Sequence, residues 1–379
     1  MNPFISNEPI RFGIVGCGAI AAAHAQAIAS VKETELVAAY SRDKNKLHNF
    51  TVNYTPGEDP LTGYTDYQAF LAHDGLDAVV LCTPNGTHAD FGIQAVRAGK
   101  HLVVEKPLEI TVERGLTLLA EAEKSGMQVA VIYQNRFIPV VMELKQIVDS
   151  NQLGRLVMVR ASVKWYRDQA YYSSRPWRGT VALDGGGALI NQAIHTTDLL
   201  LWLAGDVESI QAFRETLTHE GIEGEDALVA SFRLKSGALG VMEASTSIQP
   251  AQNRLIELHG TQGTAVLDGD SLHLQLIDAR KKHEHSGVGL AQQQGEGKKP
   301  SAGNADPFAG FSAGPHAAQY RQIAQAWLAG QTAPVSGPES LKSLAFTQAA
   351  YSSAQKGRSV APGDILRKAT STRGDERVP

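Results

Sequence analysis

A lysine follows a predicted buried strand at a position where side chains can take part in chemistry. The apolar run His101–Val104 predicts a strand of a parallel sheet, and Glu105, Lys106 and Pro107 come directly after it. Residues in that position emerge at the carboxyl edge of the sheet, where doubly wound folds bind ligands. Pro107 disfavours the α region for the residue before it, so we expect Lys106 to be held extended and to face a cleft. Taken alone, the tripeptide is equally compatible with a solvated lysine at a strand end.

A second group of polar residues lies on one predicted helix, Ala188 to Leu203. Asn191, His195 and Asp198 are spaced by four and three residues, which places them on one helical face. Residues 184–187, Asp-Gly-Gly-Gly, precede the helix, and glycines allow another group to approach closely. His195 is the natural proton acceptor, although a histidine on an apolar helix is more often a satisfied core residue. Its polar neighbours and the lysine expected across the cleft favour a catalytic role, with Asn191 orienting the substrate.

The first predicted strand ends in a glycine-rich turn that suits a dinucleotide. Gly16 and Gly18 permit a tight turn and a close approach of the backbone to a pyrophosphate, and Ala21 lets the next helix pack closely. The amino end of that helix attracts the anion. Because the motif follows a predicted strand and opens a predicted helix, we expect Gly16, Gly18, Ala19 and Ile20 to bind the coenzyme.

The residues after the second predicted strand bear on the choice of coenzyme. An acidic residue about twenty positions after the glycine turn would bind the ribose 2′-hydroxyl of NAD. This chain has Ser41 and Arg42, whose hydroxyl and guanidinium groups suit a 2′-phosphate and favour NADP. Asp43 leaves NAD open, and it is equally suited to cap the next helix.

Further candidates line the expected cleft. Thr83 and Asn85 follow the third core strand and are placed to contact the nicotinamide side, whereas His88 is either a ligand contact or a first-turn helix residue. An aromatic and basic cluster suits a polyhydroxylated substrate or the nicotinamide ring, although packing at a domain edge is the alternative. The cluster comprises Tyr166, Tyr171, Tyr172, Trp177 and Arg178. We expect Tyr166 to contact substrate, and Glu105, Lys106, Asn135, Trp177 and Arg178 to contact coenzyme.

The elements that would position these residues alternate in the first part of the chain. Short apolar runs predict strands at Phe12–Val15, Leu36–Tyr40, Ala78–Leu81, Leu102–Val104 and Val129–Ile132. Helical patterns separate them at Ala19–Ser30, His88–Ala98 and Val112–Ser125. The alternation predicts βαβ units with a doubly wound parallel sheet over residues 1–133. Residues 51–63, rich in proline and glycine, are expected to form a surface loop.

The pattern changes after residue 133, and residues 134–379 are expected to form an α+β domain with a large, mostly antiparallel open sheet. Its predicted strands are Leu156–Val163, Ser209–Phe213, Leu228–Phe232, Ala238–Ala244 and Arg254–Leu258. Helices are predicted at Pro139–Ser150, His316–Ala329 and Glu339–Gln355. Residues 277–314 lack periodicity and are expected to form a mobile loop or lid, and residues 363–379 a polar tail that is frayed or docked.

Composition excludes several classes of protein. The 379 residues, 43% hydrophobic and 20% charged, are typical of a globular chain with two domains. The net charge of −4 provides no excess of positive charge for binding nucleic acid or an anionic membrane. No apolar run is long enough to span a bilayer. Cys17 and Cys82 are expected to be buried thiols in a reducing compartment, so the cytoplasm is the expected location. No histidines and acids have the spacing of zinc ligands, and we expect no metal.

These motifs together resemble the glucose-fructose oxidoreductase, inositol 2-dehydrogenase and rhizopine-catabolism family, written Gfo/Idh/MocA. The motifs that carry the resemblance are Gly16-x-Gly18-x-x-Ala21, Thr83-Pro84-Asn85-x-x-His88, Glu105-Lys106-Pro107, and Gly185 to Gly187 followed by Asn191, His195 and Asp198. The resemblance extends from Phe12 to near Gln355. It implies a Rossmann domain, an α/β domain whose open sheet commonly forms homodimers or homotetramers, and NAD(P)-dependent oxidoreduction of a sugar, cyclitol or related compound.

The resemblance also implies roles for individual residues. The family lysine corresponds to Lys106 and the family histidine to His195, while an aspartate usually stands where this chain has Asn191. Members that resemble sugar-nucleotide (uronate) dehydrogenases also have asparagine there. The predicted reaction transfers hydride from a secondary alcohol to nicotinamide, with either His195 or Lys106 as the proton acceptor. The alternative from another class is a sensor that binds NAD(P) without turnover.

Overall fold

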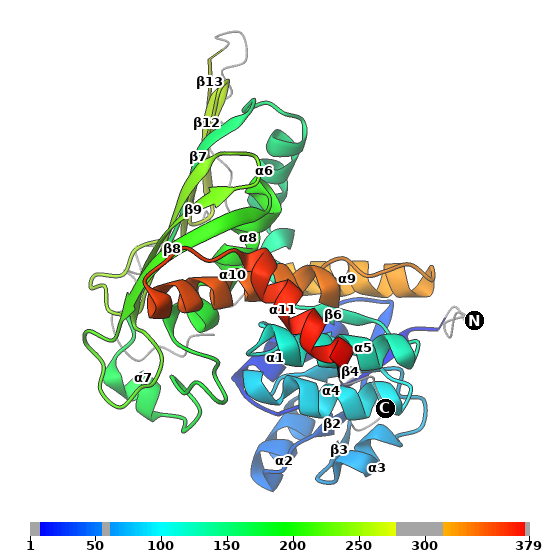
Figure 1. The fold of residues 1–379 in the computed structure, drawn as a ribbon. Coiled ribbons are helices and arrows are strands. Elements are labelled where there is room, and N and C mark those ends of the chain that lie inside the picture. The colour runs from blue at the N-terminus through cyan, green and yellow to red at the C-terminus, as the bar shows by residue number, and fades with distance from the viewer. Residues whose placement is uncertain (1–7, 55–60, 278–313, 376–379) are drawn as a thin grey trace. The chain divides into compact units, whose positions relative to one another are not determined.

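The computed structural model describes residues 8–54, 61–277 and 314–375, which form two units (Figure 1). The described part of unit 1 comprises residues 8–54, 61–109, 113–137 and 314–341. The described part of unit 2 comprises residues 110–112, 138–277 and 342–375. Residues 314–341 thus group with the N-terminal part of the chain, although they follow the whole second sheet in sequence.

Unit 1 contains a six-stranded parallel sheet with the order β3-β2-β1-β4-β5-β6. The strands are β1 (Ile10–Val15), β2 (Thr34–Tyr40), β3 (Thr62–Tyr64), β4 (Ala78–Leu81), β5 (His101–Val104) and β6 (Val129–Val131). The helices are α1 (Ala19–Ala29), α2 (Lys44–Asn53), α3 (Tyr67–Leu71), α4 (His88–Arg97), α5 (Val112–Lys124) and α9 (Gly314–Leu328), with short turns η1 (Asn85–Thr87) and η2 (Gln134–Phe137). The predicted doubly wound sheet is confirmed, and the strand order reverses between β1 and β4, where such folds bind ligands.

Continuous apolar runs explain why β4, β5 and β6 were predictable from the sequence. Every residue of β4, β5 and β6 is buried, as expected for strands covered on both faces. The predicted loop over residues 51–63 is wrong at both ends, because α2 extends to Asn53 and β3 begins at Thr62; residues 55–60 lie outside the described part. Helix α2 buries only Leu47 and Phe50, so its apolar periodicity is weak in sequence.

Helix α9 completes the core of unit 1. Tyr320 and Trp327 are fully buried, and both rings lie against Phe12 of β1, with centroid distances of 5.5 Å and 6.3 Å. The buried Gln319 amide bonds to the end of the outermost strand β6 and to the residues just after it: it donates to Val131 O at 2.8 Å and accepts from Tyr133 N at 3.1 Å. The helix therefore both covers the sheet and satisfies the backbone at its edge.

His101, the first residue of β5, links the stability of unit 1 to pH. Its ring is buried, and Nδ1 accepts the N–H of Gln128 at 3.0 Å. Burial lowers the pKa of His101 from 6.5 to about 4. Between these two values the unfolded chain binds more protons than the folded chain, so the stabilisation is present above the unfolded pKa and is lost as the pH falls toward the folded one.

We expect acidification from pH 7 to pH 5 to lower the free energy of unfolding by about 2 kcal/mol through His101. The variant His101→Asn keeps an acceptor for Gln128 but cannot gain a proton, so its unfolding free energy should fall less over the same range. Urea denaturation of both proteins at the two pH values measures the difference. His316, whose pKa burial also lowers to about 4, should keep its own contribution in the variant. Equal slopes in the two proteins would contradict the prediction.

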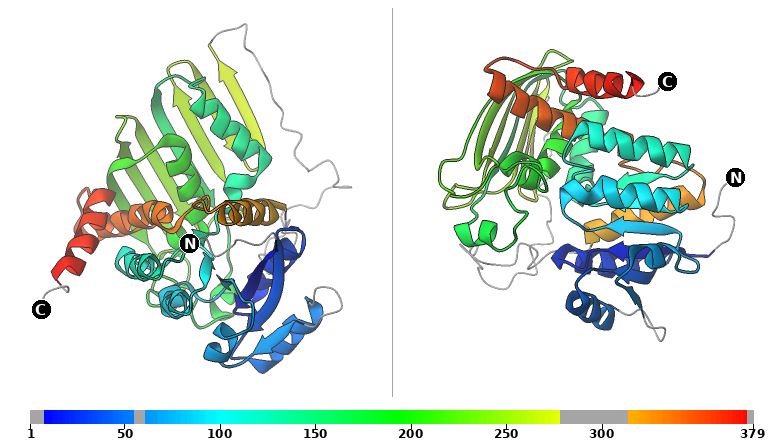
Figure 2. Two further views of the ribbon diagram at one scale, coloured as in Figure 1. Left: turned by 90° about the vertical axis from the view of Figure 1, so that its right-hand side faces the viewer. Right: turned by 60° about the horizontal axis from the view of Figure 1, so that its bottom comes forward.

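Unit 2 is built on a seven-stranded sheet with the order β13-β12-β11-β7-β10-β9-β8 (Figure 2). The strands are β7 (Leu156–Lys164), β8 (Val207–Glu215), β9 (Ala227–Leu234), β10 (Leu239–Ser245), β11 (Leu255–Gly260), β12 (Gly263–Asp268) and β13 (Ser271–Leu276). Only β7 and β10 pair in parallel, so the predicted mostly antiparallel sheet is confirmed, although β12 and β13 were not predicted. Helices α6 (Pro139–Asp149), α8 (Ile194–Ala204) and α10 (Gly337–Lys356) contribute to the core on one face of this sheet.

The opposite face of this sheet is exposed and partly apolar. Phe213 of β8 is 75% exposed and Met158 of β7 is 53% exposed. Val229, Leu239 and Val241 also project from this face, at positions that alternate with core residues along their strands. Arg160 bonds Glu243 and Glu257 across the neighbouring strands. We call these residues the open sheet face.

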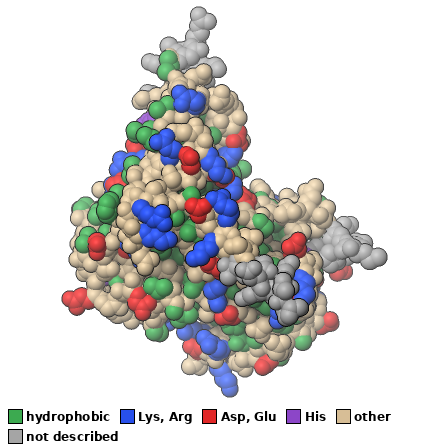
Figure 3. Space-filling model, in the orientation of Figure 1, with side chains coloured by type: hydrophobic (Ala, Val, Ile, Leu, Met, Phe, Trp, Pro, Cys, Tyr) green, Lys and Arg blue, Asp and Glu red, His purple; other side chains and the backbone are tan. Residues whose placement is uncertain are grey.

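On the side of the molecule drawn in Figure 3, acidic and basic side chains are mixed rather than separated into patches of one sign.

Three further expectations concern the helix over 188–203, the C-terminal tail and the segment over 277–314. The uninterrupted helix predicted over 188–203 is wrong in detail, because a π-helical turn, η3 (Ala188–Gln192), precedes α8. The described part of the polar tail, up to residue 375, is docked: α11 (Pro362–Asp375) follows Val360, which pairs with Ile210 of β8, and Ala369 is fully buried. The predicted lid over 277–314 lies almost wholly outside the described residues. Within the described residues, no helix is both long enough and apolar enough to cross a membrane.

Candidate functional site

The carboxyl ends of the unit 1 strands bring the predicted coenzyme residues to one edge of the parallel sheet. Gly16 follows β1 and Ser41 follows β2. Thr83 follows β4, Lys106 follows β5, and Asn135 lies in the turn after β6. Because β1 and β4 are neighbours at the point where the strand order reverses, this edge is the expected ligand-binding edge of the fold.

The glycine turn has the geometry that a pyrophosphate needs. Gly16 has φ +96°, and a Cβ there would lie 2.8 Å from the backbone oxygen of Cys82, so only glycine fits between β1 and the end of β4. Gly18 precedes α1 without a capping side chain, and a Cβ there would meet nothing within 4 Å. Ala19 and Ile20 begin the helix. The turn therefore leaves open space beside helix N–H groups, and the residues present fit the phosphates of a dinucleotide.

The two cysteines beside this turn were expected to be buried, but the structure leaves both of them partly exposed. Cys17 and Cys82 both have intermediate exposure and form no disulfide. Burial of the sulfur raises the pKa of Cys17 to about 12, and the pKa of Cys82 is raised for the same reason. Both are therefore protonated at neutral pH and are poor nucleophiles.

At the end of β2 the structure separates the roles of three adjacent residues. Asp43 caps α2: its side chain accepts the N–H groups of Asn45 and Lys46 at 3.0 Å and 3.1 Å. Its pKa is lowered, chiefly by the backbone N–H of Lys46 and by the Lys46 ammonium, which lies 3.2 Å from Oδ2. Ser41 is buried and its hydroxyl accepts from Asp43 N, while Arg42 is exposed. The capping alternative for Asp43 is thus confirmed.

His88 is placed as a structural residue. It is fully buried, with Nδ1 3.0 Å from Pro107 O and Nε2 3.0 Å from Thr83 O. Burial lowers its pKa, so the ring is neutral at pH 7 and donates to one carbonyl at a time. His88 therefore ties the segment after β4, which includes the buried Asn85, to the segment after β5.

Glu105 anchors the residue that follows it. Its Oε2 accepts the backbone N–H of Lys106 at 3.0 Å, and its Oε1 lies 2.8 Å from His24 Nε2 on α1. Burial opposes ionisation of Glu105, but the hydrogen bond from His24 and the charge of Lys106 outweigh it and lower the pKa to about 2. The carboxylate is thus charged, buried and bonded on both oxygens, while Lys106 is partly exposed.

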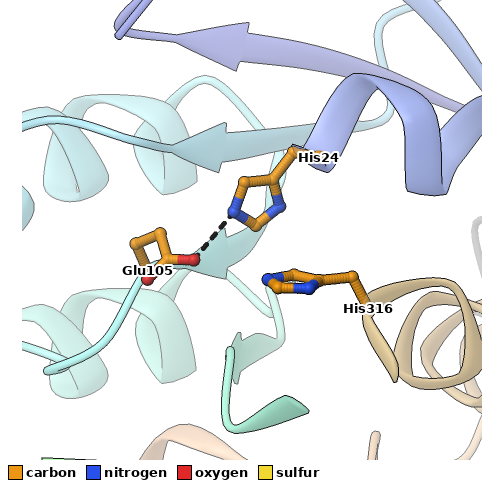
Figure 4. Close-up of side chains that lie close together, drawn as sticks. All are labelled: His24, Glu105 and His316. Carbon is orange, nitrogen blue, oxygen red and sulfur yellow. Dashed lines mark hydrogen bonds and ion pairs between the residues drawn. The ribbon is translucent and has the colours of Figure 1, made fainter. Parts of the chain in front are cut away.

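Sequence reasoning missed the partners of Glu105. His24 is fully buried, and its Nδ1 lies 2.8 Å from the Tyr320 hydroxyl of α9. His316, also of α9, brings a ring nitrogen near the same group, and the ligand atoms of His24, Glu105 and His316 all lie within 4.8 Å of one another (Figure 4). A histidine among the alanines of α1 was the only available sequence indication, since α9 is remote in the chain.

In unit 2 the predicted Asn191 is held by an acidic neighbour. Its Nδ2 donates to Asp184 Oδ1, and its Oδ1 accepts from Gln192 Nε2 at 3.0 Å. Asp184 is buried and its second oxygen accepts Gly179 N at 2.8 Å. A carboxylate therefore lies beside the asparagine. His195, one turn further on at the start of α8, is partly exposed, whereas Asp198 is buried.

The glycines before this helix make room for the chain itself. A Cβ at Gly187 would lie 1.8 Å from Glu225 O, and the carboxylate of Glu225 accepts the N–H groups of Gly187 and Leu189. Tyr351 donates to the same carboxylate at 2.9 Å. The close approach predicted from these glycines is therefore occupied by a buried backbone segment.

The aromatic and basic cluster forms a stacked set within unit 2. The Arg178 guanidinium lies 3.9 Å from the centroid of the Tyr171 ring, and Arg167 lies 5.3 Å from it. Gln192 connects this set to Asn191, since it accepts from Arg167 at 3.0 Å and donates to the Tyr171 hydroxyl at 2.9 Å. Trp177 and Tyr166 are partly exposed, while Tyr172 is buried and bonded to Thr246.

Two segments of the chain match known protein families. Residues 10–133 match an oxidoreductase family with an NAD-binding Rossmann fold, and residues 141–266 match the GFO/IDH/MocA C-terminal domain. Together the two segments cover more than half of the chain.

Individual relatives are similar over most of their length. The WlbA dehydrogenase of Bordetella pertussis, solved with NADH and UDP-GlcNAcA, is 30% identical, with a TM-score of 0.82 over 94% of this chain and 99% of that chain. Levoglucosan dehydrogenase of Pseudarthrobacter phenanthrenivorans is 27% identical over 62% of this chain and 68% of its own. A scyllo-inositol 2-dehydrogenase (NADP(+)) of Bacillus subtilis is 25% identical over 75% of this chain and 78% of its own.

Proposed function

Because the chain belongs to the GFO/IDH/MocA oxidoreductase family, we propose that it is an NAD(P)-dependent dehydrogenase acting on a secondary hydroxyl of a sugar, cyclitol or sugar derivative. Residues 1–133 are proposed as its dinucleotide-binding domain and residues 134–379 as its substrate domain, except that residues 314–341 group with unit 1 and belong with the former. The observation that carries the proposal is that Lys106, after β5, lies at the same carboxyl edge of the unit 1 sheet as the glycine turn after β1, which leaves open space at Gly18.

Each proposed catalytic residue has a defined task. Nicotinamide, when bound, supplies the hydride acceptor. Lys106 donates a hydrogen bond to the substrate hydroxyl oxygen and stabilises the charge that develops on it, which requires a donor that is fixed before reaction. His195 takes the hydroxyl proton. Asn191 orients the substrate, and its bond to Asp184 holds the amide in one direction.

The substrate is proposed to belong to the sugar-like class, with nucleotide-linked sugar acids as the first compounds to test. The relative solved with UDP-GlcNAcA is similar over nearly the whole chain. The partly exposed Tyr166 and Trp177 offer apolar faces, and the arginines stacked on Tyr171 offer donors for hydroxyl, carboxylate or phosphate groups.

A screen tests the proposal directly. UDP-linked uronic acids, free sugars, anhydrosugars and inositols are each supplied with NAD and with NADP, and reduction is followed by absorbance. Turnover of at least one compound is expected. Tight coenzyme binding without turnover of any of these compounds would instead favour the alternative function, a sensor that binds NAD(P) without catalysis.

Arg42 is proposed to select NADP, because it is exposed at the end of β2 while Asp43 is engaged as a helix cap. Arg42→Ala should raise the KM for NADP about tenfold through loss of a charge-assisted bond, with little change for NAD. Lys32→Ala is the matched control, since Lys32 is an exposed cation before the same strand. Steady-state kinetics with both coenzymes measure this, and an unchanged KM for NADP would remove Arg42 from coenzyme selection.

We also propose that the open sheet face carries a homodimer or homotetramer. Five large hydrophobic side chains are exposed there: Met158, Phe213, Val229, Leu239 and Val241. Single exposed hydrophobic residues are common on a monomer, but a group of them on one face is typical of an interaction surface. Sedimentation velocity over a dilution series tests the proposal, and a monomer at every concentration would contradict it.

A further inference from the structure

We propose that His24 and Glu105 are positioning residues that fix the backbone of Lys106 relative to the coenzyme-binding turn, with Tyr320 orienting His24. The inference rests on the proposed function, because it concerns how the catalytic lysine is held. We call His24, Glu105 and Tyr320 the anchoring network.

Hydrogen bonds link the peptide of Lys106 to helix α1, and the proposed reaction requires the lysine to keep a fixed position relative to the coenzyme. His24 lies on α1, the helix that begins directly after the glycine turn. Its Nε2 bonds Glu105 Oε1 at 2.8 Å, and Glu105 Oε2 receives the N–H of Lys106 at 3.0 Å. The peptide that carries the lysine is therefore tied, through one carboxylate, to the same helix whose amino end is proposed to bind the pyrophosphate.

Tyr320 contacts the ring nitrogen of His24 that does not bond Glu105. An ionised carboxylate only accepts hydrogen bonds, so Nε2 of His24 must carry a proton toward Glu105. The other ring nitrogen, Nδ1, lies 2.8 Å from the Tyr320 hydroxyl. The ring is bonded at both nitrogens and fully buried, which leaves it a single orientation.

A metal ion is the competing explanation, since His24, Glu105 and His316 converge (Figure 4). However, both nitrogens of His24 and both oxygens of Glu105 already have hydrogen-bond partners. The 2.8 Å separation of Nε2 and Oε1 is that of a direct hydrogen bond, and a metal between these atoms would have to break it. The contacts therefore favour an anchoring role.

Substitutions at Glu105 separate geometry from charge. Glu105→Ala removes both acceptors and should lower kcat about 100-fold, with coenzyme Kd and substrate KM within about threefold, because a small misplacement of a catalytic group acts on the chemical step. Glu105→Gln loses the charge, but its oxygen can accept from Lys106 while its amide donates to His24 in the other tautomer. Its kcat should stay within about tenfold of the wild type.

Tyr320→Phe tests the outer end of the anchoring network with a conservative change. Loss of one neutral hydrogen bond should lower kcat about fivefold and leave KM unchanged. Tyr64→Phe is the matched control, because Tyr64 in β3 also bonds a histidine Nδ1, that of His73, at 2.9 Å. That control should retain wild-type kcat. Thermal unfolding of each variant is measured in parallel, so that Tyr320→Phe and Glu105→Gln decide the matter if Glu105→Ala does not fold.

The outcomes distinguish this inference from the proposed function. If the wild type turns over no substrate, the function fails and the inference fails with it. If the wild type is active but Glu105→Ala and Tyr320→Phe match its kcat, the inference alone is overturned. Equal losses in Glu105→Gln and Glu105→Ala would assign the effect to charge and overturn it too. Stoichiometric metal in the purified wild type, lost in His316→Gln, would replace it with a metal site.

Discussion

Replacing Lys106 with methionine is expected to lower kcat about 1000-fold or more while coenzyme still binds. Methionine keeps the length and apolar stem of the side chain but has no donor for the substrate oxygen. Removing a single fixed donor from a developing oxyanion costs about 100-fold to 1000-fold, and the loss of a full positive charge belongs at the upper end. NADH fluorescence titration measures coenzyme binding, and single-turnover absorbance measures the chemical step.

Lys100→Met provides a matched control for this experiment. Lys100 lies before β5 and Lys106 after it, so the two lysines are at opposite ends of one strand. The Lys100 ammonium donates to Leu76 O at 2.8 Å, away from the carboxyl edge. The control should turn over substrate at the wild-type rate. Turnover that survives Lys106→Met would exclude the lysine from the reaction and remove the main support of the proposed function.

Replacing His195 with glutamine is expected to lower kcat about 100-fold to 10,000-fold, the range that general base catalysis contributes. Glutamine keeps hydrogen-bonding groups but cannot accept the hydroxyl proton. The wild-type rate should rise with pH as the base loses its proton, and the variant should lose that rise. The pH profile of kcat/KM between pH 5 and pH 10 measures both effects.

The same profiles assign the base. If His195→Gln keeps the wild-type pH dependence while losing only rate, the proton acceptor is Lys106, and His195 orients the substrate. His273→Gln is the control, because His273 is an exposed histidine of β13 in the same unit. It should leave both the rate and its pH dependence unchanged. A His195 variant with wild-type kcat at every pH would contradict any catalytic role for this residue.

Local patterns were sufficient for the elements whose residues lie together in the chain. The buried runs of β4, β5 and β6 and the glycine turn before α1 are specified by neighbours in sequence, because burial on both faces demands unbroken apolar residues and the turn demands glycine. By contrast, α2 buries too few residues to show a helical period. The π-helical turn at 188–192 was also hidden, since its backbone follows contacts with Glu225 rather than local propensity.

The amino-acid sequence by itself determined the family, the parallel sheet and the position of Lys106 at its carboxyl edge, because each depends on residues adjacent along the chain. Only the tertiary structure revealed what surrounds that lysine. His24 and Glu105 are 81 residues apart and His24 and Tyr320 are 296 apart, yet they form one buried set of hydrogen bonds. A buried charge is tolerated where other groups supply its hydrogen-bond partners. One partner of Glu105, the N–H of Lys106, is its neighbour in the chain, but the other, His24, is brought to it only by folding.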